Sequence, residues 1–93
     1  MRARRVTVRG RVQGVGYRDW LVREARAHGL AGWVRNRRRD GSVEALLAGP
    51  EPAVAEVLSA MRLGPPLARV ESVEEAFDEP PGEPGFRRLP TTD

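Results

Sequence analysis

The chain has no cysteine and no lysine, and it contains a single histidine, His28. The absence of cysteine excludes disulfides, thiolate catalysis and cysteine-bound metals. A single histidine argues against a zinc site too, because protein zinc sites are built mostly from several cysteine and histidine ligands. All 16 basic residues are therefore arginines, and the net charge is +3. This charge suits a protein that binds small anions as well as one that binds nucleic acid, so it does not decide between them.

Long apolar runs are also absent from the sequence. No segment approaches the roughly 20 apolar residues of a membrane-spanning helix. The first residues, MRARRVTV, lack the apolar stretch of a signal peptide. We therefore expect a soluble, cytoplasmic protein. The length of 93 residues suits one small domain over residues 1–93, with no room for a second core.

The apolar residues that are present follow two periodicities. Period-two alternation predicts strands over about residues 6–12, 30–36, 42–49 and 67–77, and helical spacing predicts helices over 18–28 and 50–63. Asp40-Gly41 indicates a hairpin turn between the second and third strands. Val70 and Val73 are three residues apart, which predicts a β-bulge in the fourth strand. Residues 86–89 could add a short closing strand.

The resulting order, β-α-β-β-α-β, predicts an α+β fold. It is the split βαβ arrangement of a ferredoxin-like sandwich, with both helices on one face of an antiparallel sheet. Many unrelated functions use this arrangement, so the fold by itself does not favour any of them.

The stretch RVQGVGYR, residues 11–18, joins the first strand to the first helix. Gly14 and Gly16 have no side chains to keep a ligand from the backbone, and they can adopt dihedral angles that aim successive N–H groups at one point. The helix N-terminus adds unpaired N–H groups, and Arg18 adds a planar fork for two anion oxygens. These features predict a cradle for a tetrahedral anion. On this stretch alone, an ordinary strand-to-helix turn is an equally good interpretation, and the spacing matches neither a Walker A loop nor a dinucleotide fingerprint.

Asn36 ends the strand that follows the first helix. An asparagine in this position ordinarily initiates a turn. Its amide also has a donor and an acceptor, so it can hold a water molecule and direct the water's lone pair at a bound phosphorus. This second role requires the fold to bring Asn36 close to the exit of the first strand, which the sequence alone does not establish.

Three stretches closely resemble the acylphosphatases: GRVQGVGYR at residues 10–18, GWVRN at 32–36 and DGSVE at 40–44. The resemblance extends from about residue 6 to residue 73 with the spacing between the motifs intact, and residues 85–89 are weakly similar to the family's closing strand. A match that is long and position-specific carries more weight than a glycine pattern alone.

The resemblance implies hydrolysis of an acyl phosphate, a carboxyl–phosphate mixed anhydride, to a carboxylate and inorganic phosphate. It implies that no metal or cofactor takes part and that Asn36 orients the attacking water. It also implies that the phosphoryl group is bound by Arg18 and by the backbone N–H groups of the loop formed by Gln13, Gly14, Val15, Gly16 and Tyr17. We expect a monomer whose partner is a small-molecule substrate. His28 lies too far along the helix from Arg18 to act as a base.

Two features depart from the family's usual pattern. Tyr17 stands where phenylalanine is more common, a change that we expect to be tolerated if the hydroxyl reaches water. The connection NRRRDG, residues 36–41, is one residue longer than the commonest form. Loops usually absorb such insertions locally, but this one leaves the orientation of Asn36 open.

The main rival interpretation is a nucleic-acid-binding module of the same fold. It is motivated by the arginines at positions 2, 4 and 5 and by the run at 37–39, which could contact phosphates. RNA-recognition sheets also need exposed aromatic residues for base stacking, and Tyr17 and Trp20 lie outside the predicted strands. We therefore favour a solvated surface and do not favour nucleic acid as a partner.

Two further alternatives concern the site itself. A non-catalytic domain is disfavoured because both Arg18 and Asn36 are present. Hydrolysis of simple phosphate esters is disfavoured because the sequence offers no metal ligands or acid to assist a poor leaving group.

Overall fold

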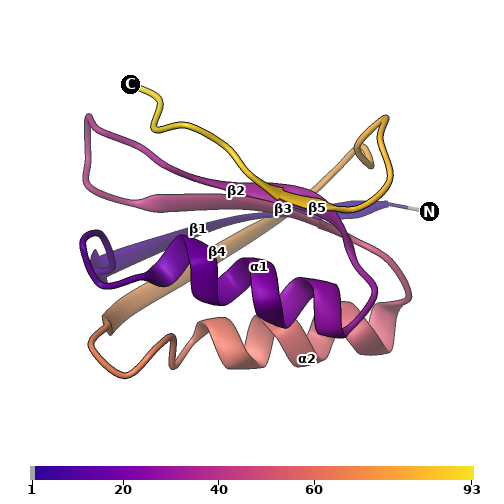
Figure 1. Ribbon diagram of the computed structural model, residues 1–93. Coiled ribbons are helices and arrows are strands. Elements are labelled where there is room, and N and C mark those ends of the chain that lie inside the picture. The colour runs from indigo at the N-terminus through magenta and orange to yellow at the C-terminus, as the bar shows by residue number, and fades with distance from the viewer. Residues whose placement is uncertain (1) are drawn as a thin grey trace.

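The computed structural model describes residues 2–93. Residues 2–93 form five strands and two helices, in the order β1 (Ala3–Arg11), α1 (Tyr17–Ala27), β2 (Ala31–Asn36), β3 (Val43–Ala48), α2 (Glu51–Met61), β4 (Arg69–Asp78) and β5 (Phe86–Arg88) (Figure 1). The predicted α+β, ferredoxin-like order is confirmed, and the short closing strand is present. Within residues 2–93, neither helix is long and apolar enough to cross a membrane.

The strands form one sheet in the order β4-β1-β3-β2-β5. β3 lies between β1 and β2 and pairs antiparallel with both, and β4 pairs antiparallel with β1. β5 instead runs parallel to β2, so the sheet is antiparallel except at this edge. Both helices lie on the same face of the sheet, as predicted (Figure 1).

The core lies between the helices and the sheet. It is built from the residues that the two periodicities place on the inner faces, namely Val6, Val8, Leu21, Ala25, Val34, Val43, Ala45, Leu47, Val54, Val57, Leu58 and Met61. Burying a large apolar side chain of this kind contributes about 1.5–3 kcal/mol. The burial of these faces therefore holds both helices against the sheet and orients the loop that precedes α1.

The predicted bulge in β4 lies opposite Gly10. Arg9 pairs with Ser72 but Gly10 pairs with Val70, so Glu71 is the extra residue. Gly10 has a φ of 127°, and a Cβ there would lie 2.2 Å from the carbonyl oxygen of Arg69. Glycine therefore allows the two strands to approach closely just before the chain enters the loop toward α1.

The face of the sheet away from the helices carries a network of ion pairs. Glu44 on β3 is buried there, between Arg35 at 2.9 Å and Arg5 at 3.0 Å. Burial raises the pKa of Glu44, but the hydrogen bonds from these arginines outweigh that effect, so its pKa lies below its ordinary value. In the β2–β3 loop, Arg37 pairs with Asp40 at 2.6 Å. Several of the arginines that motivated the nucleic-acid interpretation are thus engaged by carboxylates.

Candidate active site

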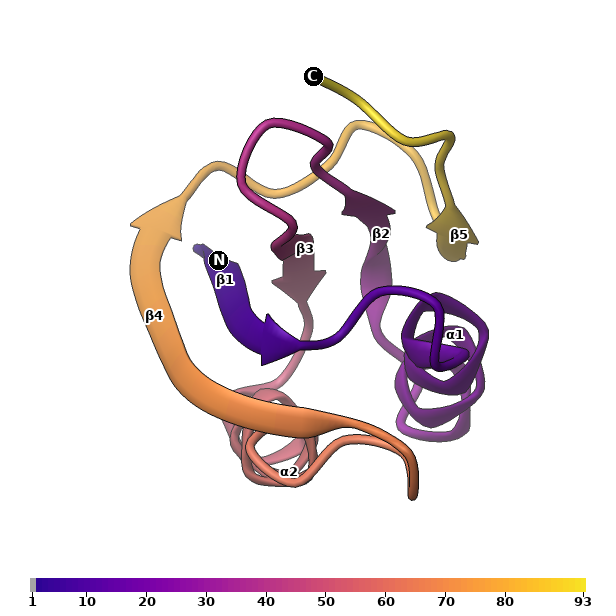
Figure 2. The same ribbon diagram turned by 90° about the vertical axis from the view of Figure 1, so that its left-hand side faces the viewer.

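The carboxyl ends of β1 and β2 meet at one edge of the sheet. Because both strands run antiparallel to β3, they point in the same direction. β1 ends at Arg11 and continues into the loop before α1, and β2 ends at Asn36. Figure 2 faces this edge and shows the loop between the end of β2 and the start of β4. The sheet topology therefore supplies the proximity that the sequence left open.

The loop between β1 and α1 spans residues 12–16 and contains two glycines in the left-handed region. Gly14 has a φ of 73° and Gly16 a φ of 79°. Residues with a Cβ rarely adopt such angles, which explains glycine at both positions. Gly16 is the N-cap of α1, and its carbonyl accepts the Trp20 N–H at 3.0 Å. The N–H groups of the first helical turn have no partner within the helix, so the loop and the turn together present backbone donors.

Gln13 holds this loop against the β2–β3 hairpin. Its side-chain Nε2 donates to the carbonyl oxygens of Arg37 and Ser42, each at 2.9 Å. The hairpin is closed between the same two residues, because the Arg37 N–H donates to the Ser42 carbonyl at 2.9 Å. The side chain of Gln13 thus fixes the distance between the loop and the residue next to Asn36.

Arg18 extends from the first turn of α1 and is half-buried. Its Nη1 donates a long hydrogen bond of 3.4 Å to the Leu89 carbonyl. Burial lowers the pKa of Arg18, and the positive charge of Arg88 lowers it further, while Asp19 acts in the opposite direction. Arg88 itself pairs with Asp19 at 2.7 Å. Two guanidinium groups therefore lie near the start of α1, and among residues 2–93 Asp19 forms an ion pair with Arg88 but not with Arg18.

Asn36 is buried at the end of β2, with 9% of its surface exposed. It pairs with Val43 across the hairpin, and its carbonyl accepts the Thr92 N–H at 2.9 Å. The longer connection after it is absorbed within residues 37–42, where Asp40 accepts hydrogen bonds from both the backbone and the hydroxyl of Ser42. The Asn36 side chain is less well satisfied, because its buried Oδ1 accepts no hydrogen bond from any described residue. A buried acceptor of this kind ordinarily has a partner.

These groups line one small open pocket of about 180 Å³, formed by Val12, Gly14, Gly16, Tyr17, Arg18, Asp19, Asn36 and Arg88. Five of the residues predicted for the site are among them. Gln13 and Val15 do not line the pocket, although they belong to the same loop. No three Asp, Glu, His or Cys side chains in residues 2–93 are grouped so as to hold a metal ion.

The acylphosphatase family model matches residues 4–88. The chain belongs to the acylphosphatase family. It is 58% identical over 91 residues to the acylphosphatase of Acidiphilium cryptum (strain JF-5), a match that covers 98% of this chain and 99% of the relative. It is 67% identical over 75 residues to an acylphosphatase of Rhodopseudomonas palustris (strain BisB5), covering 78% and 75% of the two chains.

Solved structures agree with this assignment. The crystal structure of the acylphosphatase from Bacillus subtilis superposes with a TM-score of 0.89 at 38% identity, covering 96% of this chain and 99% of that one. The resemblance drawn from the sequence is thus confirmed. The protein is an enzyme of acyl phosphate hydrolysis, with a small-molecule acyl phosphate as substrate and phosphate as product.

The expectation that the Tyr17 hydroxyl of this acylphosphatase reaches water is not met. The hydroxyl does not reach water, because only 2% of the residue is exposed and the hydroxyl donates to the Met61 carbonyl at 2.7 Å. Met61 ends α2, where carbonyl groups lack helical partners, so the tyrosine satisfies one of them. Burial raises the pKa of the phenol further above its ordinary value. The change from phenylalanine therefore adds a hydrogen bond between the two helices.

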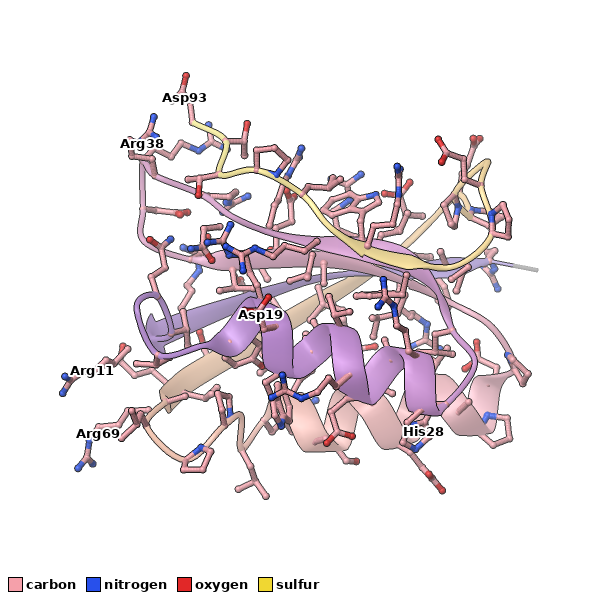
Figure 3. All side chains as sticks on the ribbon, viewed as in Figure 1. Arg11, Asp19, His28, Arg38, Arg69 and Asp93 are labelled. Carbon is pink, nitrogen blue, oxygen red and sulfur yellow. The ribbon has the colours of Figure 1, made fainter. Side chains whose placement is uncertain are left out.

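His28 lies away from the pocket, as expected. It is the C-cap of α1, at the opposite end of the helix from Asp19 (Figure 3). Its Nδ1 donates to the Glu24 carbonyl at 3.0 Å, and its Nε2 lies 2.9 Å from Glu56 on α2. These contacts raise the pKa of His28, the backbone hydrogen bond most of all. The histidine links the two helices and does not face the site.

Sequence reasoning missed Arg88 as part of the acylphosphatase site. β5 pairs parallel with β2, and this pairing sets Arg88 beside Val34, on the same side of the sheet as α1. The sequence signal for Arg88 is the phenylalanine two residues earlier. Phe86 is a core residue, and alternate residues of a strand face the same side of the sheet. A strand of three residues shows too little alternation for this inference from sequence.

Proposed function

We propose that this acylphosphatase holds the phosphoryl group of its substrate on the backbone of Gln13–Tyr17 and on Arg18. We also propose that Asn36 orients the attacking water and that no metal takes part. The observation that carries the proposal is that Asn36 lines the same pocket as Gly14, Gly16 and Arg18, with an Oδ1 that has no hydrogen-bond partner among residues 2–93.

Binding of the phosphoryl group rests on donors held at fixed positions. The N–H groups of the first turn of α1 point out of the helix N-terminus, where the helix dipole places about half a positive charge. Arg18 adds a guanidinium that can bind two oxygens at once. Phosphoryl transfer spreads negative charge over three equatorial oxygens in its transition state, so donors arranged around them stabilise that state.

Asn36 prepares the water for attack. Its Oδ1 accepts a hydrogen bond from the water and directs the oxygen lone pair toward phosphorus. The water oxygen then bonds to phosphorus as the bond from phosphorus to the acyl oxygen breaks, and the carboxylate leaves with the electron pair. A phosphoryl oxygen accepts the proton, and no side chain serves as the base. A carboxylate is a weak base and leaves without a general acid.

The deciding experiment is phosphate release from benzoyl phosphate in the presence of EDTA. We expect rapid turnover by the wild type, and both weaker substrate binding and slower turnover by Arg18→Ala. Arg23→Ala is the matched control, because Arg23 is an exposed arginine of the same helix that does not line the pocket. Turnover that needs added Mg²⁺ would contradict the metal-independent mechanism, and normal turnover by Arg18→Ala would contradict the role of Arg18. Phenyl phosphate, a simple ester, should be turned over weakly or not at all.

We also propose that residues 1–93 act as one domain and as a monomer. The proposed reaction needs no second copy, because the loop glycines, Arg18 and Asn36 meet within a single copy of the chain. Light scattering should give a mass near 10.3 kDa at assay concentrations. A dimer under those conditions would contradict it.

A further inference from the structure

A second pocket lies on the other side of the loop that precedes α1. It has a volume of about 430 Å³ and is lined by Arg11, Gly14, Val15, Pro66, Leu67, Ala68 and Arg69. Gly14 borders both pockets, so only the loop separates them. The second pocket lies on the β4 side of β1, whereas Asn36 lies on the β2 side. We refer to it as the β4-side pocket.

Two arginines that form no ion pair with any residue from 2 to 93 border the β4-side pocket. Arg11 ends β1 and Arg69 begins β4, and the two residues are paired in the sheet register. Both are exposed, and their side chains project from this edge of the molecule in the same direction (Figure 3). Neither has a carboxylate within ion-pairing distance among the described residues, unlike Arg9, whose guanidinium pairs with Asp40 and Glu74. Two positive charges held side by side repel each other, and an anion between them would relieve that repulsion.

The other side chains that line the β4-side pocket are apolar. Val15 contributes from the loop, and Pro66, Leu67 and Ala68 contribute from the connection between α2 and β4. Leu67 is 73% exposed, so its side chain is available to a bound molecule. The pocket thus combines an apolar wall with two cationic side chains, which is the composition expected of a site for a short carbon chain that carries a negative charge.

The proposed mechanism directs the acyl group toward the β4 side, across Gly14, which lines both pockets. In phosphoryl transfer the attacking and leaving oxygens lie roughly in line on opposite sides of phosphorus. With the water held by Asn36 on the β2 side, the leaving carboxylate points away from β2. The β4-side pocket lies in that direction, with Val15 on the loop that would hold the phosphoryl group.

We propose that the β4-side pocket is the subsite for the acyl group and that it selects acyl phosphates whose chain ends in a second negative charge, which Arg11 and Arg69 bind. This inference rests on the proposed function, because it places the phosphoryl group on the loop. It assigns the enzyme a substrate class, the acyl phosphates of dicarboxylic or otherwise anionic acids.

The test compares two probes that differ only in the terminal charge. These are the phosphonate analogues of adipoyl and hexanoyl phosphate, in which a methylene group replaces the oxygen between the carbonyl carbon and phosphorus. Calorimetric titration gives the ratio of their dissociation constants. We expect the wild type to bind the charged analogue about tenfold more tightly, as two exposed charge-assisted contacts would supply.

Variants test whether the two arginines cause the preference for the charged analogue. We expect it to shrink in Arg11→Gln and in Arg69→Gln and to vanish in the double variant. Arg2→Gln is the matched control, because it removes the same charge at the opposite end of β1, where Arg2 stacks on Phe77. This control should keep the wild-type ratio. Thermal melts verify folding, and the single variants decide the matter if the double variant does not fold.

A ratio near one in the wild type would overturn the subsite, and so would a ratio that the arginine variants leave unchanged. Turnover of benzoyl phosphate by Arg18→Ala and Asn36→Ala tests the proposed function separately. If the analogues bind the wild type with the expected ratio but both variants turn over normally, the preference for the charged chain stands and the proposed roles of Arg18 and Asn36 fail.

Discussion

The side-chain amide of Gln13 donates a hydrogen bond of 2.9 Å to the carbonyl oxygen of Arg37, the residue that follows Asn36. This contact joins the loop proposed to bind the phosphoryl group to the strand end proposed to hold the water. The two halves of the site belong to strands that are not neighbours in the sheet. A single side chain therefore contributes to the spacing between the phosphoryl group and its nucleophile.

We predict that Gln13→Leu lowers kcat more than it raises KM. The variant removes two hydrogen bonds, but the Ser42 carbonyl keeps the Arg37 N–H and the Arg37 carbonyl keeps the Gly41 N–H. No buried acceptor is left unpaired, so the loss of stability should be about 0.5–1.5 kcal/mol for each hydrogen bond removed. The larger effect on kcat follows because small misplacements of reacting groups slow reactions strongly. Steady-state kinetics with benzoyl phosphate and a thermal melt measure the two effects. A destabilised variant with a normal kcat would show that Gln13 supports only the fold.

Asn36→Ala should reduce kcat by about 100-fold, as expected when a reacting group loses its orientation, with little change in KM. The side chain lines the pocket, and no residue in the described part of the chain donates to its Oδ1, so its removal should cost the fold little. Single-turnover kinetics separate the chemical step from product release. A near-normal kcat would remove Asn36 from the mechanism.

Arg88→Gln should weaken the binding of inorganic phosphate, whereas Asp19→Asn should not. Both variants break the same ion pair of 2.7 Å, but only the first removes a positive charge that acts on Arg18. The pair is largely exposed, so breaking it should cost the fold little. Calorimetry with phosphate distinguishes the two effects. Equal affinities in the two variants would show that the pair acts only by linking β5 to α1.

His28 should stabilise the protein at low pH without affecting catalysis. Its folded pKa is raised above the ordinary value of 6.5, so the stabilisation is complete below that value and is lost as the pH rises through the raised pKa. The difference in melting temperature between the wild type and His28→Gln should therefore shrink with increasing pH. The pH profile of kcat should be the same for both proteins, because His28 lies at the far end of α1. A shifted profile would place the histidine in the reaction.

Tyr17→Phe should destabilise the protein by about 1 kcal/mol, the net contribution of one hydrogen bond. The lost bond runs from the Tyr17 hydroxyl to the Met61 carbonyl, and the ring remains packed edge-on against Trp20. Urea titration measures the change in the free energy of unfolding. The kinetic constants should stay the same, because the hydroxyl points away from the pocket toward α2. A lower kcat would mean that this bond also positions the loop.

Much of the fold could be predicted from the sequence because its determinants are local. Alternation and helical spacing predicted the first four strands and both helices, and two valines three residues apart predicted the bulge in β4. Gly14 and Gly16 predicted the shape of the loop, because few other residues adopt a positive φ. Patterns of this kind depend only on neighbours along the chain.

Tertiary structure alone decided how the parts of the site meet. The approach of Asn36 to the loop depends on β3, which pairs with both β1 and β2 and aligns their carboxyl ends. The contacts of Gln13 with the hairpin, of the Tyr17 hydroxyl with Met61 and of Arg88 with Asp19 join residues 24 to 69 positions apart. No local periodicity specifies such contacts. They arise when the burial of apolar faces selects one sheet order, and that order determines which polar side chains lie within hydrogen-bonding distance.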